Sequence, residues 1–317
     1  MSANAKPVHT PVMEAEVVQA LLPALSVPGA ILVDGTVGLG GHAAALLSAC
    51  PDSRLIGLDH DGQALALASE RLASFGDRVE LVRCRFDSLA SVLDSRGVGS
   101  VNAVLLDLGL SSLQIDQESR GFAYSKDTPL DMRMDDRLVD SAATIVNGWS
   151  VEEMARIFAD LGEEPRALRV AQAIVSARSL ARITSTGRLV RIIEAAMPAA
   201  IRFGSGGHPA KRVFQALRMA VNSEREALVG VLPVALERLA VGGRMAVLSY
   251  HSGEDRLVKQ AFVSGCRDQT PRRLPVVPES HLPGFRLVSK AKPLAAEISS
   301  NPRSASAHLR VVERIRK

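Results

Sequence analysis

Short apolar runs alternate with helical patterns through the first third of the chain. Residues 42–50 and 63–72 have the three-and-four spacing of amphipathic helices, and the apolar runs around them are short and bounded like buried strands. The predicted strands are 31–33, 54–58, 79–85 and 101–106. Strands that alternate with helices in this way favour βαβ units, so we predict a doubly wound, largely parallel sheet.

The pattern changes after residue 112. Residues 114–134 are polar and rich in turn formers, and residues 142–200 read as helices with no strand between them. Within this stretch, Ser150 and Glu153 have the spacing of a capping box, which marks the start of a helix. We therefore predict a separate helical unit.

An α/β pattern resumes beyond a glycine-rich connection at 202–209. One long helical pattern runs to Leu239, an apolar run follows at 242–252, and residues 309–315 have the character of a last strand. Residues 270–283 are rich in proline and arginine and are expected to form a loop. We predict one α/β domain of residues 1–113 and 208–317, interrupted by a helical domain of residues 114–207.

Composition is consistent with this two-domain organisation. A chain of 317 residues with 47% hydrophobic content can bury two cores. No signal peptide is evident in residues 1–10, and no apolar run approaches the roughly 20 residues that span a bilayer, so we expect a cytoplasmic protein without membrane contact. The three cysteines, Cys50, Cys84 and Cys266, form no CxxC pair, so we predict neither disulfide framework nor metal site.

The charge balance permits nucleic-acid binding without requiring it. There are 38 basic and 34 acidic residues, a net charge of +4, and only 3% aromatic residues, so any RNA contact should rest on Arg and Lys rather than on stacking platforms. Ordinary surface charge is the alternative for each of the candidates, which are Lys211, Arg212, Arg218, Arg272, Arg273, Arg303 and Arg310.

The turn after the first predicted strand is the candidate ligand site, because ligands of open α/β sheets bind beyond the carboxyl ends of the strands. The glycines run Gly38-x-Gly40-Gly41 and are preceded by Asp34, whereas a pyrophosphate-binding turn has the spacing G-x-G-x-x-G. An acid at this place suits a cationic ligand such as S-adenosylmethionine. Asp59 and Asp107 end two further strands, and Asp59 is placed to receive the ribose hydroxyls.

Each of these features also has a purely structural interpretation. The three acids could close turns or cap helices, although all three doing so beside one glycine turn is the less favoured interpretation. His42 could be an ordinary first-turn helix residue instead of a cofactor contact.

The sequence resembles the small-subunit ribosomal RNA methyltransferase H family, also called MraW, over essentially its whole length. The resemblance is carried by many distinctive blocks in one order. These are His9–Met13, Asp34–Thr36, Gly40–His42, Gly57–Asp59, Leu106–Ser112, Arg120–Phe122, Pro129–Met134, Gly162–Glu164, His208–Ala210, Arg212–Arg218, Ser249–Ser252, Glu254–Arg256 and Asn301–Ser304. Gly253 is a departure, because a larger apolar residue is usual there.

The resemblance implies a class I, Rossmann-like, S-adenosylmethionine-dependent methyltransferase with an inserted helical substrate-recognition domain. Its implied reaction is N4-methylation of one cytidine, cytidine 1402, in the decoding centre of 16S rRNA within the small ribosomal subunit. The oligomeric state stays open between monomer and homodimer. The implied cofactor contacts are Gly40, Gly41, His42, Asp59, Phe86, Asp107 and Gln114. Phe86 is equally well explained as a core residue at a strand end.

The catalytic residues are less well defined by the sequence. Many amino-methyltransferases carry an Asp-Pro-Pro-Tyr segment where this chain has Asp107-Leu-Gly-Leu-Ser-Ser, so their mechanism does not transfer directly. We expect Asp107 to align the acceptor amine and Tyr250 and His251 to offer stacking or proton acceptance. Local hydrogen bonding at a strand end is the alternative for Tyr250 and His251. A methyltransferase of small molecules or proteins and a non-catalytic ribosome-assembly factor are the rival functions.

Overall fold

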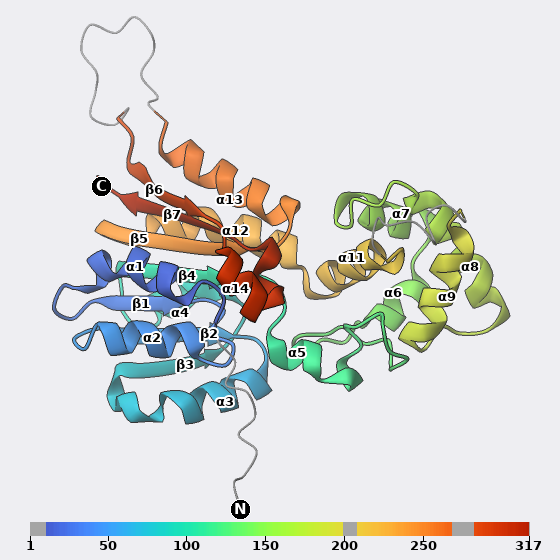
Figure 1. The fold of residues 1–317 in the computed structure, drawn as a ribbon, viewed down its shortest axis with the longest axis horizontal. Helices are drawn as coiled ribbons and strands as arrows, with labels where there is room; N and C mark the ends of the chain where they lie inside the picture. Colours follow the sequence, from blue (N-terminus) through green and yellow to red (C-terminus); the bar gives the residue numbers. More distant parts are fainter. Residues whose placement is uncertain (1–10, 199–207, 268–281, 317) are drawn as a thin grey trace, which may run out of the picture. The chain divides into compact units, whose positions relative to one another are not determined.

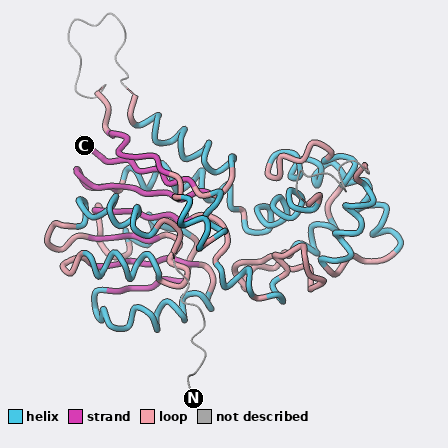
Figure 2. Tube along the Cα trace, viewed as in Figure 1, coloured by secondary structure: helices cyan, strands magenta, loops and turns pink. Residues whose placement is uncertain are grey.

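The computed structural model describes residues 11–198, 208–267 and 282–316. The chain divides into two compact units: unit 1 comprises Met1–Gly109 and Ala227–Lys317, and unit 2 comprises Leu110–Glu226. Unit 1 contains a sheet with helices, whereas the described part of unit 2 contains helices and no strand (Figures 1 and 2). Unit 2 includes residues 114–207, for which a helical domain was predicted, and extends to Leu110 and Glu226.

Unit 1 is built on a seven-stranded sheet of order β3-β2-β1-β4-β5-β7-β6. Neighbouring strands from β3 to β5 are parallel, and β7 runs antiparallel to both β5 and β6. The strands are β1 (Ile31–Asp34), β2 (Arg54–Asp59), β3 (Val79–Arg83), β4 (Val101–Asp107), β5 (Leu239–Ser249), β6 (Phe285–Ala291) and β7 (His308–Arg314).

Helices cover both faces of this sheet (Figure 1). The larger helices of unit 1 are α1 (Glu14–Leu25), α2 (Gly41–Ala49), α3 (Gly62–Leu72), α4 (Leu89–Asp94), α12 (Glu224–Glu237), α13 (Ser252–Gly265) and α14 (Ala295–Ser300). The 3-10 helices are η1 (Ala73–Arg78), η2 (Phe86–Ser88) and η5 (Pro302–Ser306). Side chains of successive strand residues point to opposite faces of the sheet. Leu105 packs in the cluster with α1, α2 and α3, and Leu106 packs in the cluster with α4, α12 and α13. Because both faces are buried there, the central strands β1, β2 and β4 read as largely apolar runs.

The strand order reverses between β1 and β4. The chain moves outward from β1 through β2 to β3 and then returns to lay β4 on the other side of β1. At such a switch point the connections leave the two strands in opposite directions, which opens a crevice beyond their carboxyl ends. Asp34 ends β1 and Asp107 ends β4, so two of the predicted site residues lie at this crevice.

Unit 2 has its own apolar core. The core residues all lie between Leu130 and Val221 and include the fully buried Phe158. The helices are α5 (Ser112–Asp116), η3 (Glu118–Arg120), α6 (Ala142–Gly148), α7 (Val151–Asp160), α8 (Ala167–Leu180), α9 (Thr186–Ala196) and α11 (Ala210–Asn222). The predicted capping box is present at the start of α7, where the Ser150 hydroxyl and the Glu153 carboxylate each accept a backbone N–H of the other residue.

Three features differ from the sequence prediction. The expected single helix ending at Leu239 is two helices, because Ser223 adopts a left-handed conformation (φ 50°) and separates α11 from α12. As a consequence α11 belongs to unit 2, and the second segment of unit 1 begins at Ala227 instead of residue 208. The strand β6 was not predicted, and most of the loop expected at 270–283 lies outside the described residues. In the part of the chain that is described, no helix is long and apolar enough to cross a membrane.

Candidate functional site

Backbone hydrogen bonds fix the loop after β1 to both neighbouring strands. The Gly35 N–H donates to the Leu105 carbonyl of β4 at 2.9 Å, and the Val37 N–H donates to the Leu58 carbonyl of β2 at 2.9 Å. The Thr36 hydroxyl oxygen accepts from the Asp107 N–H at 2.6 Å. The glycine turn that follows is therefore presented at the carboxyl ends of three strands.

Two glycines of this turn are needed for different reasons. Gly40 caps α2 with φ of 75°, a left-handed conformation that costs glycine little. Gly41 is limited by space, because a Cβ atom there would lie 2.5 Å from Cγ of Pro11. By contrast, a Cβ on Gly38 would meet only the Thr36 carbonyl oxygen, at 3.7 Å, so the turn is open above Gly38.

Asp34 is almost completely buried at the end of β1, with 2% of its surface exposed. Its Oδ1 accepts the Thr36 N–H at 3.1 Å, so the residue does help to close the turn. Burial raises the pKa of Asp34 to about 7, against the opposing effects of His42 and the Thr36 N–H. Asp34 can therefore exchange a proton near neutral pH.

Asp59 at the end of β2 ties the glycine turn to the start of α3. Its Oδ2 accepts the Gly38 N–H and its Oδ1 accepts the Asp61 N–H, both at 2.9 Å. Burial raises the pKa of Asp59, although these amides favour its ionised form. Each carboxylate oxygen can accept more than one hydrogen bond, so this role is compatible with the predicted contact to ribose hydroxyls.

His42 lies in the first turn of α2 with 7% of its surface exposed. Among the described residues neither ring nitrogen has a hydrogen-bond partner of normal geometry, but Nε2 lies 3.6 Å from Oδ2 of Asp107, within ion-pair distance. Burial lowers the pKa of His42, but the carboxylates of Asp107, Asp34 and Glu14 outweigh burial and raise it. Nδ1 has no such neighbour among the described residues, and a buried ring nitrogen without a partner is unusual and points to a ligand that completes its contacts.

A hydrogen bond joins Tyr250 to Asp107 at the crevice. The Tyr250 hydroxyl donates to Oδ1 of Asp107 at 2.7 Å across a separation of 143 residues. Burial, followed by the Asp107 carboxylate, raises the pKa of Tyr250, so the phenol remains a hydrogen-bond donor at neutral pH. The Asp107 side chain keeps a quarter of its surface exposed. It is therefore oriented by Tyr250 yet accessible to a second partner.

His251 makes local contacts at the start of α13, although its buried Nε2 has no hydrogen-bond partner of normal geometry among the described residues. It is the N-cap of α13, where Nδ1 accepts the Glu254 N–H at 3.4 Å, and its Nε2 lies 3.0 Å from Oε1 of Glu254. The other oxygen of Glu254 accepts the Tyr250 N–H at 2.9 Å. His251 and Glu254 thus support the backbone that carries Tyr250.

Two other predicted cofactor contacts occupy different surroundings. Phe86 begins η2 beyond β3, is half-buried, and packs against the core with its Cβ 3.1 Å from the position of a Cβ on Gly35. Gln114 belongs to unit 2, where it completes a capping box with Ser111 at the start of α5. The cofactor contact of Gln114 stays a prediction.

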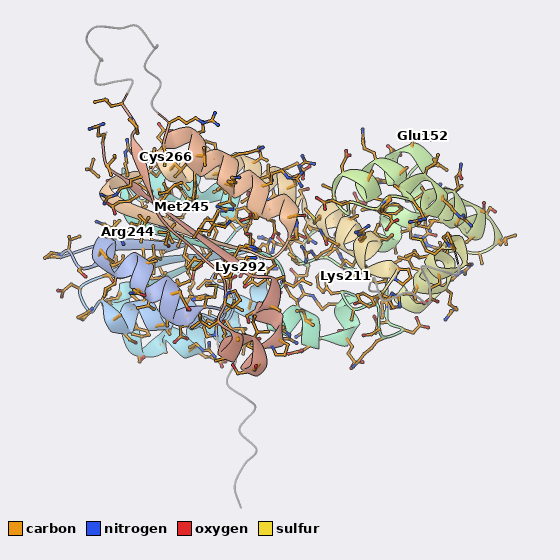
Figure 3. All side chains as sticks on the ribbon, turned by 45° about the horizontal axis from the view of Figure 1, so that its top comes forward. Glu152, Lys211, Arg244, Met245, Cys266 and Lys292 are labelled. Carbon is orange, nitrogen blue, oxygen red and sulfur yellow. The ribbon has the colours of Figure 1, made fainter. Side chains whose placement is uncertain are left out.

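The basic candidates for RNA contact divide into exposed and paired residues. Lys211 and Arg212 are exposed on α11 (Lys211 is labelled in Figure 3). In contrast, Arg218 is bound by both oxygens of Glu224, and Arg310 is 8% exposed and bound by both oxygens of Asp255. Arg303 is exposed, and Arg272 and Arg273 lie outside the described residues. Arg310 is therefore a structural residue rather than a phosphate contact.

Sequence reasoning missed two acids and a hydroxyl around the site. Thr36 binds the backbone of Asp107, Glu14 acts on the charge of His42, and Glu297 of α14 acts on Tyr250. No local sequence pattern predicts the role of Glu297, because its partners lie far away in the sequence.

The arrangement as a whole can hold a ligand with cationic and hydroxyl groups, and it offers one oriented carboxylate to a hydrogen-bond donor. Among the residues that can be described, no cluster of His, Cys, Asp and Glu is arranged to hold a metal ion.

Comparison with known proteins assigns the chain to a family. The family model described as the MraW methylase family matches residues 6–315. The protein named ribosomal RNA small subunit methyltransferase H from Acidothermus cellulolyticus is 54% identical over 98% of this chain and 94% of its own length. The protein of the same name from Cutibacterium acnes is 52% identical over 98% of this chain and 92% of its own length. A solved rRNA methylase from Streptococcus thermophilus aligns over 99% of this chain and 100% of its own, with 14% identity and a TM-score of 0.43. On the match over nearly its whole length, the chain belongs to the MraW methylase family.

Proposed function

We propose that this chain transfers a methyl group from S-adenosylmethionine to small-subunit ribosomal RNA, and that the acceptor is N4 of cytidine 1402 in the decoding centre. The observation that carries the proposal is the oriented Asp107 carboxylate beside the glycine turn, at the switch point of the sheet. Family membership and the names of the relatives support the rRNA substrate.

The residues at the crevice fit this cofactor. Nδ1 of His42 lacks a partner among the described residues, the turn is open above Gly38, and the acids suit a ligand with sulfonium, ammonium and ribose hydroxyl groups. The residues proposed to hold it are Gly40, Gly41, His42, Asp59, Phe86, Asp107 and Gln114. When bound, S-adenosylmethionine supplies a methyl carbon made electrophilic by the sulfonium.

The acceptor amine needs help because the lone pair of cytosine N4 is delocalised into the ring. An enzyme can localise it by accepting a hydrogen bond from the amine and by fixing the direction of approach. We assign this role to Asp107, whose Oδ1 is held by the Tyr250 hydroxyl. Asp107 would then receive the proton that N4 loses when the methyl group passes from the cofactor's sulfur to N4, because the C–S bond would break as the C–N bond forms.

Tyr250 and His251 act differently in this proposal from the sequence expectation. Tyr250 orients Asp107 as a donor instead of accepting a proton, because its phenol stays protonated. Nδ1 of His251 accepts the Glu254 N–H, and Nε2 lies 3.0 Å from Oε1 of Glu254 without hydrogen-bond geometry. We therefore leave His251 out of the chemistry and assign it to the cap of α13.

The test is methyl transfer from labelled S-adenosylmethionine to undermodified small subunits and to deproteinised rRNA, followed by mass spectrometry of the nucleosides. N4-methylcytidine at cytidine 1402 supports the proposal in full. Asp107→Asn should reduce transfer strongly, and Asp52→Asn, which changes an exposed carboxylate before β2, should not. Cofactor binding without labelled RNA would favour a small-molecule or protein substrate. Subunit binding without turnover would favour an assembly factor.

A further inference from the structure

The segment before α1 ends in a residue with a left-handed backbone conformation, whose N–H is bound by a side chain of another helix. Met13 is the N-cap residue of α1, adopts a left-handed conformation (φ 52°), and is 1% exposed. It provides no side-chain cap to the helix. Its N–H instead donates to Oε1 of Glu297 in α14 at 2.7 Å, across 284 residues of sequence. A side chain of α14 thus binds the backbone at the start of α1.

The same segment forms the backing of the glycine turn. The buried Pro11 ring lies where a Cβ atom on Gly41 would be, with Cγ only 2.5 Å from that position. Met13 packs in one core cluster with Val37 and Ala43, which lie on either side of the turn. Displacement of Pro11–Met13 would therefore leave one side of the turn unsupported.

Carboxylates of this region also influence the pKa values of site residues. Glu14 is one of the carboxylates that raise the pKa of His42. The pKa of Tyr250 is raised first by burial and then by acids that include Glu297. Glu297 and the segment Pro11–Glu14 are therefore neighbours of the site residues, although neither is part of the strand-end set.

We propose that Glu297 is a positioning residue, which binds the Met13 N–H and thereby holds Pro11–Met13 against the Gly40–Gly41 turn that receives the cofactor. Glu297 itself touches neither reactant in this scheme. The inference rests on the proposed function for the identity of the ligand. It gives a role to two sequence blocks that the proposed chemistry does not use: His9–Met13 contains the residue that is held, and Asn301–Ser304 ends the helix that carries Glu297.

The test compares Glu297→Ala with Glu297→Gln in the full chain. Alanine removes the acceptor, whereas glutamine keeps an oxygen at the same place without the charge. Ser299→Ala is the matched control, because Ser299 is exposed on the same helix and its hydroxyl donates to the Ala295 carbonyl within that helix. Calorimetric titration with S-adenosylhomocysteine and amide hydrogen exchange over residues 11–14 and 38–42 give two readouts that do not depend on turnover.

We expect Glu297→Ala to weaken S-adenosylhomocysteine binding about tenfold, the scale of one lost charge-assisted hydrogen bond, and to speed exchange in both segments. Glu297→Gln should restore most of the affinity and the slow exchange, and Ser299→Ala should match the wild type. Unchanged affinity and exchange in Glu297→Ala would overturn the inference, as would an equal loss in the alanine and glutamine variants. If the wild type itself binds no S-adenosylhomocysteine, the proposed cofactor fails, and the exchange data still decide whether Glu297 holds the segment.

Discussion

At the scale of single residues, the hydroxyl of Tyr250 has one evident task, which is to fix the Asp107 carboxylate. Tyr250→Phe keeps the buried ring and removes the donor. We expect kcat to fall about tenfold with little change in cofactor affinity, because a hydrogen bond to a charged group contributes about 1.5 kcal/mol or more. Steady-state kinetics with undermodified subunits measure the effect. The same change at Tyr124, the chain's other tyrosine, keeps its ring contacts with His208 and Phe214 and should leave kcat intact. An unchanged kcat in Tyr250→Phe would remove Tyr250 from the mechanism.

The buried carboxyl of Asp34 gives a second prediction at this scale. Its pKa is about 7 in the folded chain and near 3.8 in the unfolded chain, so the folded state binds the extra proton between these values. Stability therefore falls as the pH rises through this window and is level above it. His42, whose pKa is also raised, contributes with the same sign, and it faces Asp34, Asp107 and Glu14.

Asp34→Asn should remove most of this pH dependence. Between pH 5 and 8 the wild type should lose about 3 kcal/mol of unfolding free energy relative to the variant, because about two pH units separate pH 5 from the pKa of about 7 and each contributes about 1.4 kcal/mol. Urea unfolding at the two pH values measures the difference. Asp52→Asn, at an exposed carboxyl, should track the wild type at both values. A constant gap between the wild type and Asp34→Asn would show that Asp34 ionises normally.

At the scale of secondary-structure elements, Gly162 sets how closely α7 approaches α11. A Cβ atom at Gly162 would lie 2.5 Å from the Arg212 carbonyl oxygen and 2.9 Å from the Phe158 carbonyl oxygen, and neither backbone atom can move easily. Gly162→Ala should therefore destabilise unit 2 by about 1–3 kcal/mol, as overpacking does. Gly230→Ala is the control, because nothing lies within 4 Å of a Cβ there and α12 should gain slightly from alanine. Thermal unfolding, monitored by circular dichroism, measures the stability of both variants. Equal unfolding midpoints in the two variants would contradict the prediction.

The strands and helix ends also show what could and could not be predicted from the sequence. The strands β1, β2, β3 and β4 were found because each is an apolar run followed by a turn, and their order places the acids at one edge. β6 is an edge strand whose side chains are mostly exposed, so it carries no apolar signal. The break at Ser223 was missed because a serine, not a glycine, adopts the left-handed conformation. Contacts such as Tyr250 with Asp107 and Met13 with Glu297 join residues 143 and 284 positions apart, which no local pattern reveals.

At the scale of the whole molecule, each unit buries its own core. The two apolar clusters of unit 1 lie on opposite faces of one sheet and draw on both of its sequence segments. The cluster of unit 2 runs from Leu130 to Val221 and so lies entirely within the inserted segment. An insertion that carries a complete core can add a second surface without interrupting the sheet that receives it.

Residues 110–226 should consequently fold when expressed alone. We expect a helical circular dichroism spectrum and one cooperative urea transition, because the buried cluster is complete within the segment and cooperativity follows from a single packed core. Phe158→Ala in the isolated segment should cost about 3–5 kcal/mol, since Phe158 is fully buried. Leu180→Ala, at a side chain that is 88% exposed, should cost far less. A segment without a cooperative transition, or one equally affected by both substitutions, would mean that the helical unit depends on unit 1 for its core.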